Sequence, residues 1–278
     1  MMSLLSIGEL VRKQDPERYL CCLFAPENRR QDLFTLLAFN HELVNSVARA
    51  SEEMVGLIRL QWWRDVLAGF ASGRVPEQEI AAALAGVVLR HGISVNRLEG
   101  LIDAREKDLD DTGPKTQDDL VAYCQGTSAG LSDLMLDVLG VDHEVSRAAA
   151  RDAAIGFALS GLLRSSAHLA AGGRAMVPDE VLDRAGLSAS DWRRGKGAPV
   201  RAAAGEVAAM ARTHIANARA RSGEIDRASL PVLLQATLAS WHLDRLEAKG
   251  NDPFHPVLAN RLALAPLRLA LTAYRGRY

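Results

Sequence analysis

The stretch Ala38-Phe39-Asn40-His41-Glu42-Leu43-Val44-Asn45-Ser46-Val47-Ala48 decides the fold class of this 278-residue chain. It closes a longer segment in which apolar residues recur at the spacing of one helical face, namely Leu33, Leu36, Leu37, Phe39, Leu43, Val44 and Val47. A strand would instead alternate apolar and polar residues one by one. The pattern therefore predicts a long helix whose second half also carries polar side chains, at Asn40, His41, Glu42 and Asn45.

The same helical period runs through the rest of the chain. We predict helices over residues 52–70, 77–90, 95–110, 116–139, 143–171, 199–222 and 230–249. Asn260 is expected to cap a last helix that is kinked at Pro266. The sequence shows no credible pair of strands, and no low-complexity linker divides it. It therefore predicts one all-α domain over residues 1–278.

Composition and charge bound the function of this domain. The 33 Lys and Arg residues nearly balance the 34 Asp and Glu residues, so nothing indicates a nucleic-acid-binding protein. Cys21, Cys22 and Cys124 show neither zinc-site spacing nor a disulfide pattern, which suits a reducing compartment. No signal peptide is evident, and no apolar run reaches the roughly 18 residues that span a bilayer. We expect a cytoplasmic protein without a transmembrane segment, with peripheral attachment at the inner face of the membrane left open.

A second decisive stretch is Gly161-Leu162-Leu163-Arg164-Ser165-Ser166-Ala167-His168-Leu169. Together, the two stretches resemble the aspartate-rich helices of the squalene/phytoene synthase family. The family frames run Ala-Phe-Cys-Arg-x-x-Asp-Asp-x-x-Asp and Asn-x-x-Arg-Asp-x-x-x-Asp. The aspartates that lie one turn apart in each frame are replaced in this chain by Val44 and Ala48 and by Ser165 and Leu169.

Other segments carry the resemblance over most of the chain. The family's Leu-Pro-x-x-x-Arg start, Trp-Arg segment and Asp-Leu-Asp step are similar to residues 26–30, 61–64 and 108–110. Its Tyr-Cys-x-Tyr-Val-Ala-Gly motif is similar to Tyr123-Cys124-Gln125-Gly126-Thr127-Ser128-Ala129. The second aromatic residue of that motif contributes to catalysis in squalene synthases, and Gly126 stands there instead. The resemblance implies an isoprenoid-synthase-type helical bundle around a central cavity.

The missing aspartates bear directly on the family's chemistry. These enzymes ionise an allylic diphosphate, and magnesium neutralises the charge of the leaving group. Magnesium takes oxygen ligands, chiefly carboxylates, waters and substrate phosphates. Val44, Ala48 and Leu169 offer no ligand oxygen, and Ser165 offers only a neutral hydroxyl. We therefore predict no catalytic residues, no metal site and no cofactor.

Further segments resemble one branch of the family more closely. They are residues 19–26, 38–43, 103–111 and 252–256. This catalytically eroded branch contains the mitochondrial assembly factor of respiratory complex I. The resemblance implies a non-catalytic pseudo-synthase that acts in assembly of a membrane respiratory complex. Its partners would be respiratory complex subunits or other assembly proteins.

Two other functions stay open. The chain could be a head-to-head prenyl transferase acting on farnesyl or geranylgeranyl diphosphate. Its magnesium ligands would then come from elsewhere, with Glu42, Asp103 and Asp110 as the candidates. Alternatively, the central cavity that the family resemblance implies could bind an isoprenoid, lipid or quinone. Loss of the acidic residues at its entrance does not require that its apolar interior be filled by side chains.

The residues expected around a residual pocket are Asn40, His41, Glu42, Asn45, Tyr123, Arg164 and His168. Arg164 is expected either to pair with Glu42 or to remain an anion-binding group. We expect His168 to be a core histidine rather than a ligand. His41 and Glu42 begin a zinc-peptidase pattern, but Asn45 replaces its second histidine, which excludes that site. Of the adjacent Trp62 and Trp63, one should face the core and the other the surface.

Overall fold

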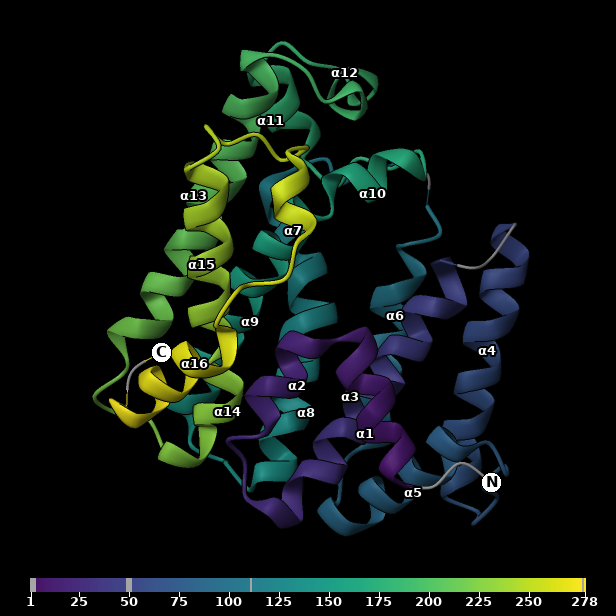
Figure 1. Ribbon diagram of the computed structural model, residues 1–278. Helices are drawn as coiled ribbons and strands as arrows, with labels where there is room; N and C mark the ends of the chain where they lie inside the picture. The colour runs from purple at the N-terminus through teal and green to yellow at the C-terminus, as the bar shows by residue number, and fades with distance from the viewer. Residues whose placement is uncertain (1–3, 49–51, 111, 277) are drawn as a thin grey trace.

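The computed structural model describes residues 4–48, 52–110, 112–276 and 278. Helices follow one another along the chain, and the described residues contain no strand (Figure 1). The prediction of an all-α fold is confirmed. Within these ranges, no helix is both long enough and apolar enough to cross a bilayer.

The first half of the chain forms the right side of the molecule in Figure 1. Its helices are α1 (Leu4–Gln14), α2 (Pro16–Cys22), α3 (Glu27–Ala48), α4 (Glu53–Phe70), α5 (Glu79–His91) and α6 (Val95–Glu106). Asp15 begins α2 by accepting a hydrogen bond from the backbone N–H of Arg18 at 3.2 Å. Gly92 ends α5 in the left-handed conformation, with φ of 60°. Local sequence signals thus fix where several of these helices begin and end.

The predicted helix 116–139 contains a wider helical turn near its middle. It consists of α7 (Gln117–Cys124), the π-helical segment η1 (Gln125–Ala129) and α8 (Gly130–Leu139). Thr116 and Asp119 form a capping box at its start. The π-helical segment coincides with the Gly126-containing motif, and such segments are frequent at functional sites.

The predicted helix 143–171 is not a single straight helix. It divides into α9 (Glu144–Arg164) and α10 (Ser166–Ala171), with Ser165 at φ −89° and ψ 3° between them. The backbone hydrogen bond from Leu169 N to Ser165 O survives at 2.9 Å. Because the break contains neither proline nor glycine, no residue type at this point predicts the kink.

The remaining helices complete the left and upper parts of the molecule in Figure 1. They are α11 (Asp179–Arg184), α12 (Ala189–Arg194), α13 (Ala198–Ala220), η2 (Arg227–Ser229), α14 (Leu230–Leu233), α15 (Gln235–Glu247), η3 (Pro256–Ala259) and α16 (Ala265–Tyr274). The expected cap and kink of the last helix were wrong. Asn260 follows η3, and Pro266 lies in the first turn of α16, where its missing N–H costs no helical bond.

Helix α9 lies in the interior and packs against α13, α15 and η1. Its contact with α13 is close, because a Cβ added at Gly156 would lie 2.7 Å from Cγ1 of Ile215. On α4, Trp63 is 2% exposed and Trp62 is 42% exposed, which confirms that only one of the pair faces the core. Side-chain packing around α9 therefore holds together segments from both halves of the chain.

Candidate functional site

The first aspartate-rich frame lies on the C-terminal half of α3. Asn40 is buried, Val44 is half-buried and Ala48 is exposed at the end of the helix. Glu42 and Asn45 are half-buried beside them. The two positions that would carry aspartates are thus at least partly open to solvent, but neither side chain can bind a metal.

The second frame lies across the break between α9 and α10. Ser165 and Leu169 are half-buried, and Leu169 lies on the short α10, which extends away from the end of α9 in Figure 1. His168 on the same turn is exposed. The expectation of a core histidine was therefore wrong, because the kink at Ser165 turns this segment toward the surface.

Arg164 ends α9 and points to a partner that the sequence did not suggest. Its Nη1 atom lies 3.0 Å from Oε1 of Glu17, on α2. The expected pair with Glu42 is not formed. The same Glu17 oxygen lies 2.8 Å from Nε2 of His242, on α15. We refer to Glu17, Arg164 and His242 as the buried acid cluster, and it ties together three helices that are far apart in sequence.

Burial and charge oppose one another in this cluster. Burial disfavours ionisation of Glu17, but the hydrogen bond from His242 and the charge of Arg164 outweigh it and hold the pKa of Glu17 below its ordinary value. Burial lowers the pKa of His242, against the opposing effect of Glu17. The other carboxylate oxygen of Glu17, Oε2, is buried and has no hydrogen-bond partner among the described residues. The cluster is therefore an ionised acid held by two donors on one oxygen.

A second cluster surrounds Tyr123 and includes a buried acid, Asp108. The Tyr123 hydroxyl donates to Oδ1 of Asp108 at 2.9 Å. Arg105 donates to Oδ2 of Asp108 at 3.1 Å, and Arg174 donates to Oδ1 at 2.8 Å. Arg105 also reaches Oδ1 of Asn40 at 3.5 Å. We refer to these five residues as the tyrosine cluster.

The tyrosine cluster joins two predicted pocket residues, Asn40 and Tyr123, through residues that sequence reasoning did not select as site residues. Burial raises the pKa of Tyr123, so its hydroxyl stays protonated and donates. Because its carboxylate accepts hydrogen bonds from three donors, Asp108 serves to hold the helices together. Asp108, which belongs to the family's Asp-Leu-Asp step, therefore has a structural role in this chain. The motif was the only sequence signal that marked this residue as important.

The residues packed around Gly126 leave no room for a larger side chain at this position. A Cβ added there would lie 2.8 Å from Cβ of Ala104 on α6. Real Cβ atoms do not approach so closely, so helix α6 occupies the space that an aromatic side chain would need. The departure from the family motif at Gly126 is therefore accompanied by a close contact between α6 and η1.

The residues present do not fit a magnesium–diphosphate site at the two frames. Val44, Ala48 and Leu169 have no oxygen donor in their side chains, and Ser165 is a neutral hydroxyl. Among the described residues, no group of three or more His, Cys, Asp or Glu side chains is arranged to hold a metal ion. Of the alternative ligands, Asp103 is bound to Arg64 at 2.7 Å. The two frames themselves supply no carboxylate for magnesium, and the absence of a cofactor stays a prediction.

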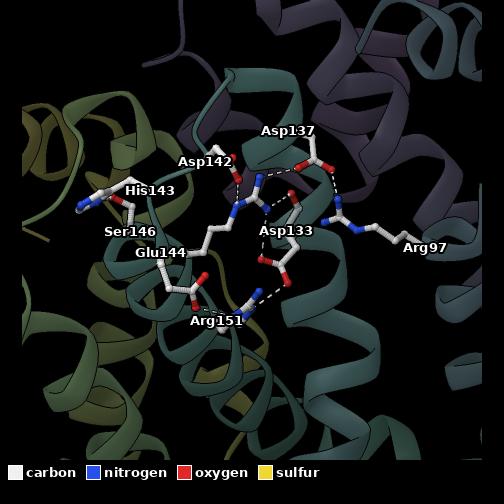
Figure 2. A network of polar contacts seen from close by, with 9 residues as sticks. Arg97, Asp133, Asp137, Asp142, His143, Glu144, Ser146 and Arg151 are labelled. Atoms are coloured by element: carbon white, nitrogen blue, oxygen red, sulfur yellow. Dashed lines mark hydrogen bonds and ion pairs between the residues drawn. The ribbon is translucent and has the colours of Figure 1, made fainter. Parts of the chain in front are cut away.

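A third polar network lies at the junction of α8 and α9 (Figure 2). Arg147 on α9 lies 2.6 Å from Oδ1 of Asp137 and 3.7 Å from Oδ1 of Asp133. Arg151 extends it with a 2.9 Å contact to Asp133, and Arg97 on α6 also pairs with Asp137. Each acid in this network already has a basic partner. Its role is to fasten α6, α8 and α9, and it offers no open site.

Comparison with known proteins agrees with this architecture. A family model described as squalene/phytoene synthase matches residues 11–272. The chain is 32% identical over 271 residues to a bovine protein named NADH dehydrogenase (ubiquinone) complex I, assembly factor 6, covering 97% of this chain and 81% of that protein. The human protein of the same name is 30% identical with the same coverage. A chloroplastic phytoene synthase 3 from Zea mays is 26% identical, covering 89% of this chain and 60% of that protein.

Solved structures show the same fold at lower identity. A dehydrosqualene synthase superposes with a TM-score of 0.85 at 17% identity, covering 98% of this chain and 95% of that one. The squalene synthase HpnC from Alicyclobacillus acidocaldarius superposes with a TM-score of 0.80, also at 17% identity, covering 90% and 95%. The prediction of an isoprenoid-synthase-type bundle is confirmed.

Proposed function

The chain belongs to the squalene/phytoene synthase family, and from this premise we propose that it is a non-catalytic member acting in assembly of a membrane respiratory complex of the complex I type. The supporting relatives are those named complex I assembly factor 6, which match 97% of the chain. The partners in this proposal are complex I subunits or other assembly proteins. The place of action is the inner face of the membrane.

One observation carries the non-catalytic part of the proposal. The positions of the two aspartate pairs that lie one turn apart in the family hold side chains that cannot neutralise a diphosphate, namely Val44, Ala48, Ser165 and Leu169. Transition-state charge would develop there without its main stabiliser. The replacement of the motif aromatic by Gly126, with α6 packed against it, supports the same conclusion.

A deletion strain provides the test of the assembly role. Loss of the gene is expected to lower assembled complex I and its NADH-oxidising activity, as measured by native gel electrophoresis and membrane assays. The wild-type gene should restore both. Normal complex I in the deletion strain would overturn the proposal.

A matched variant separates assembly from prenyl transfer. Replacing the remaining candidate metal ligands together, by Glu42→Gln, Asp103→Asn and Asp110→Asn, removes their charge at nearly constant shape. Asp103 and Asp110 are exposed and Glu42 is half-buried, so the fold should survive. The triple variant is expected to restore complex I as well as the wild type. A folded triple variant that fails to do so would contradict a role without metal chemistry.

The similarity to phytoene synthase and the close superposition on dehydrosqualene synthase favour prenyl transfer as the second candidate. Purified protein would be incubated with magnesium and radiolabelled farnesyl or geranylgeranyl diphosphate. We expect no squalene-like or phytoene-like product above a boiled control. Native mass spectrometry of the same protein tests the remaining candidate, retention of an isoprenoid or other lipid.

A further inference from the structure

The last helix, α16, carries an unusual surface. Leu264 just before it is 73% exposed, and within it Leu267 and Leu271 are 67% and 46% exposed. Tyr274 is 89% exposed. At about 100° per residue, the three helical residues fall within roughly 60° of one another. We refer to these four residues as the C-terminal apolar face.

The opposite side of α16 is the one that packs on the protein. Ala265 and Leu269 are buried there, and α16 contacts α15 and α2. The C-terminal apolar face therefore points directly away from the bundle. Single exposed leucines are common on protein surfaces, but an unbroken helical row of them indicates a contact site.

Charge around this face has one sign. From Pro253 to Tyr278 the sequence contains four arginines and no Asp or Glu, although the whole chain has a net charge of −1. Arg268 and Arg275 lie along one edge of the apolar face and are exposed. The nearby Asp244 is already paired with Arg212 at 3.2 Å. A surface that covers this helix must therefore tolerate apolar groups and carry negative charge.

A cavity of about 400 Å³ adjoins the arginine edge of α16. Arg219 and Arg268 both line it, together with Ser, Thr and Tyr side chains. Arg219 binds the main-chain oxygen of Tyr278 at 2.6 Å and Ser240 at 2.9 Å, and Arg268 stacks 3.6 Å from the ring centroid of Trp241. Asp244 is paired with Arg212, and neither Arg219 nor Arg268 forms an ion pair with an Asp or Glu side chain of the described residues. The cavity thus presents two cationic groups and several hydroxyls to an anionic headgroup.

We propose that α16 is a membrane-contact helix, which inserts the C-terminal apolar face at the acyl boundary of an anionic phospholipid surface while Arg268 and Arg275 face the headgroups. Interfacial helices combine an apolar face with basic residues in this way. Tyr274 suits the same depth, because aromatic residues with a polar tip favour the interface. The inference deepens the location part of the proposed function. Its test is made on purified protein without an assembly assay, so either one can fail alone.

Another exposed apolar row provides the matched control. Met54 and Ile58 on α4 are each 62% exposed, and helix α4 lies on the opposite side of the molecule from α16 in Figure 1. The exposed acids Glu52, Glu53 and Asp65 outnumber the one exposed arginine of α4, Arg59, so this row lacks the net positive charge that favours anionic lipid. It should not bind the same vesicles.

The experiment is sedimentation of the purified full chain with phosphatidylcholine vesicles containing about one-third phosphatidylglycerol. We expect wild-type binding that falls at least fivefold on pure phosphatidylcholine or in high salt. Leu267→Glu with Leu271→Glu should weaken binding about tenfold, whereas Met54→Glu with Ile58→Glu should leave it within about twofold. Arg268→Gln with Arg275→Gln should remove most of the preference for anionic lipid.

Several results would overturn the assignment. They are no binding by the wild type, unchanged binding by the α16 leucine variant, or an equal loss in the α4 variant. Circular dichroism establishes that each variant is folded before it is compared. Analytical ultracentrifugation tests a second copy of the chain as the occupant. A wild-type dimer that becomes monomeric in the leucine variant, without vesicle binding, would replace the lipid surface by self-association.

Discussion

Two adjacent residues at the end of α9 differ in whether they carry a charge and in what they contact. Arg164 is held in the buried acid cluster, 3.0 Å from Glu17. The next residue, Ser165, is half-buried at a position where the family carries a metal-binding aspartate. A charged side chain is thus present at Arg164, where it joins helices, and absent at Ser165, where a carboxylate would bind magnesium. The structural role of Arg164 therefore does not depend on a carboxylate at the neighbouring frame position.

Removing the acid of the buried cluster should give the largest effect. Glu17→Leu leaves Arg164 and His242 without their shared acceptor. Breaking one partner out of a buried ion pair typically costs about 3–5 kcal/mol, and the partial exposure of Arg164 favours the lower end. For a chain of this size, we expect the melting temperature to fall by roughly 5–9 °C.

The matched control is Glu106→Leu, which makes the same chemical change at a more exposed pair. Glu106 lies 2.8 Å from Arg64, and its side chain is 37% exposed. Such surface pairs contribute under about 1 kcal/mol. Equal melting shifts in the two variants would show that the buried acid cluster is no more important than a surface ion pair.

Gly126 tests the contact between α6 and η1. In Gly126→Ala, the new Cβ would lie 2.8 Å from Cβ of Ala104, and such overpacking costs about 1–3 kcal/mol. Adding Ala104→Gly should recover part of that loss, because it removes the atom that clashes. Chemical denaturation of the two single variants and the double variant measures the coupling.

Gly100 on α6 provides the control for this prediction. A Cβ added there meets nothing within 4 Å, and alanine is a better helix former than glycine. Gly100→Ala should therefore raise stability by about 0.5–1 kcal/mol. If Gly126→Ala is as harmless as Gly100→Ala, the space beside η1 is open and the lost aromatic had room to remain.

The helices were predictable because their apolar period is strong, and the capping box at Thr116 marked one boundary. The acid of the buried cluster was not predictable. Glu17 lies 147 residues before Arg164 and 225 before His242, so no local pattern links them. In the first turn of α2, Glu17 looks like an ordinary favourable charge near a helix N-terminus.

In the candidate site, too, some residues were predictable from the sequence and their contacts were not. Asn40 and Tyr123 do meet in one polar cluster, as a shared pocket would require, but through Arg105 and Asp108. The surface position of His168 depends on the kink at Ser165, which leaves the helical hydrogen bond at Leu169 intact. Motifs indicated which residues matter, whereas their partners depended on packing between distant segments.

Acidification should weaken the buried acid cluster. The folded pKa of His242 is below its ordinary value of 6.5, so the unfolded chain binds the proton first. Stability is therefore present above about pH 6.5 and declines as the pH falls below it. The pKa of Glu17 is also lowered, so its contribution disappears as the pH falls below the ordinary value of 4.5.

Melting curves from about pH 7.5 to about 5.5 isolate the histidine contribution. The melting temperature of the wild type should fall by a few degrees more than that of His242→Gln. His168→Gln changes an exposed histidine and should follow the wild type. A wild-type slope that persists in His242→Gln would assign the pH dependence to another group.

The smallest effect is expected at the two aspartate-rich frames. Magnesium with pyrophosphate should leave the melting temperature of the wild type unchanged, because the four positions lack ligands. In a functional site, ligand at a hundredfold excess over its dissociation constant would stabilise the fold by about 2.7 kcal/mol. A rise of several degrees that EDTA abolishes would mean that a metal–diphosphate site survives.

Restoring the aspartates sharpens this test. Because Ala48 is exposed and Val44 is half-buried, Val44→Asp with Ala48→Asp alone should cost under about 1 kcal/mol. Adding Ser165→Asp and Leu169→Asp completes the family's acidic set, and magnesium should then raise the melting temperature if the two frames converge. We expect no prenyl transfer, since Gly126 remains. If the four-aspartate variant melts identically with and without magnesium, the kink between α9 and α10 has carried the second frame out of register with α3, and the loss of the site lies in the backbone as well as in the side chains.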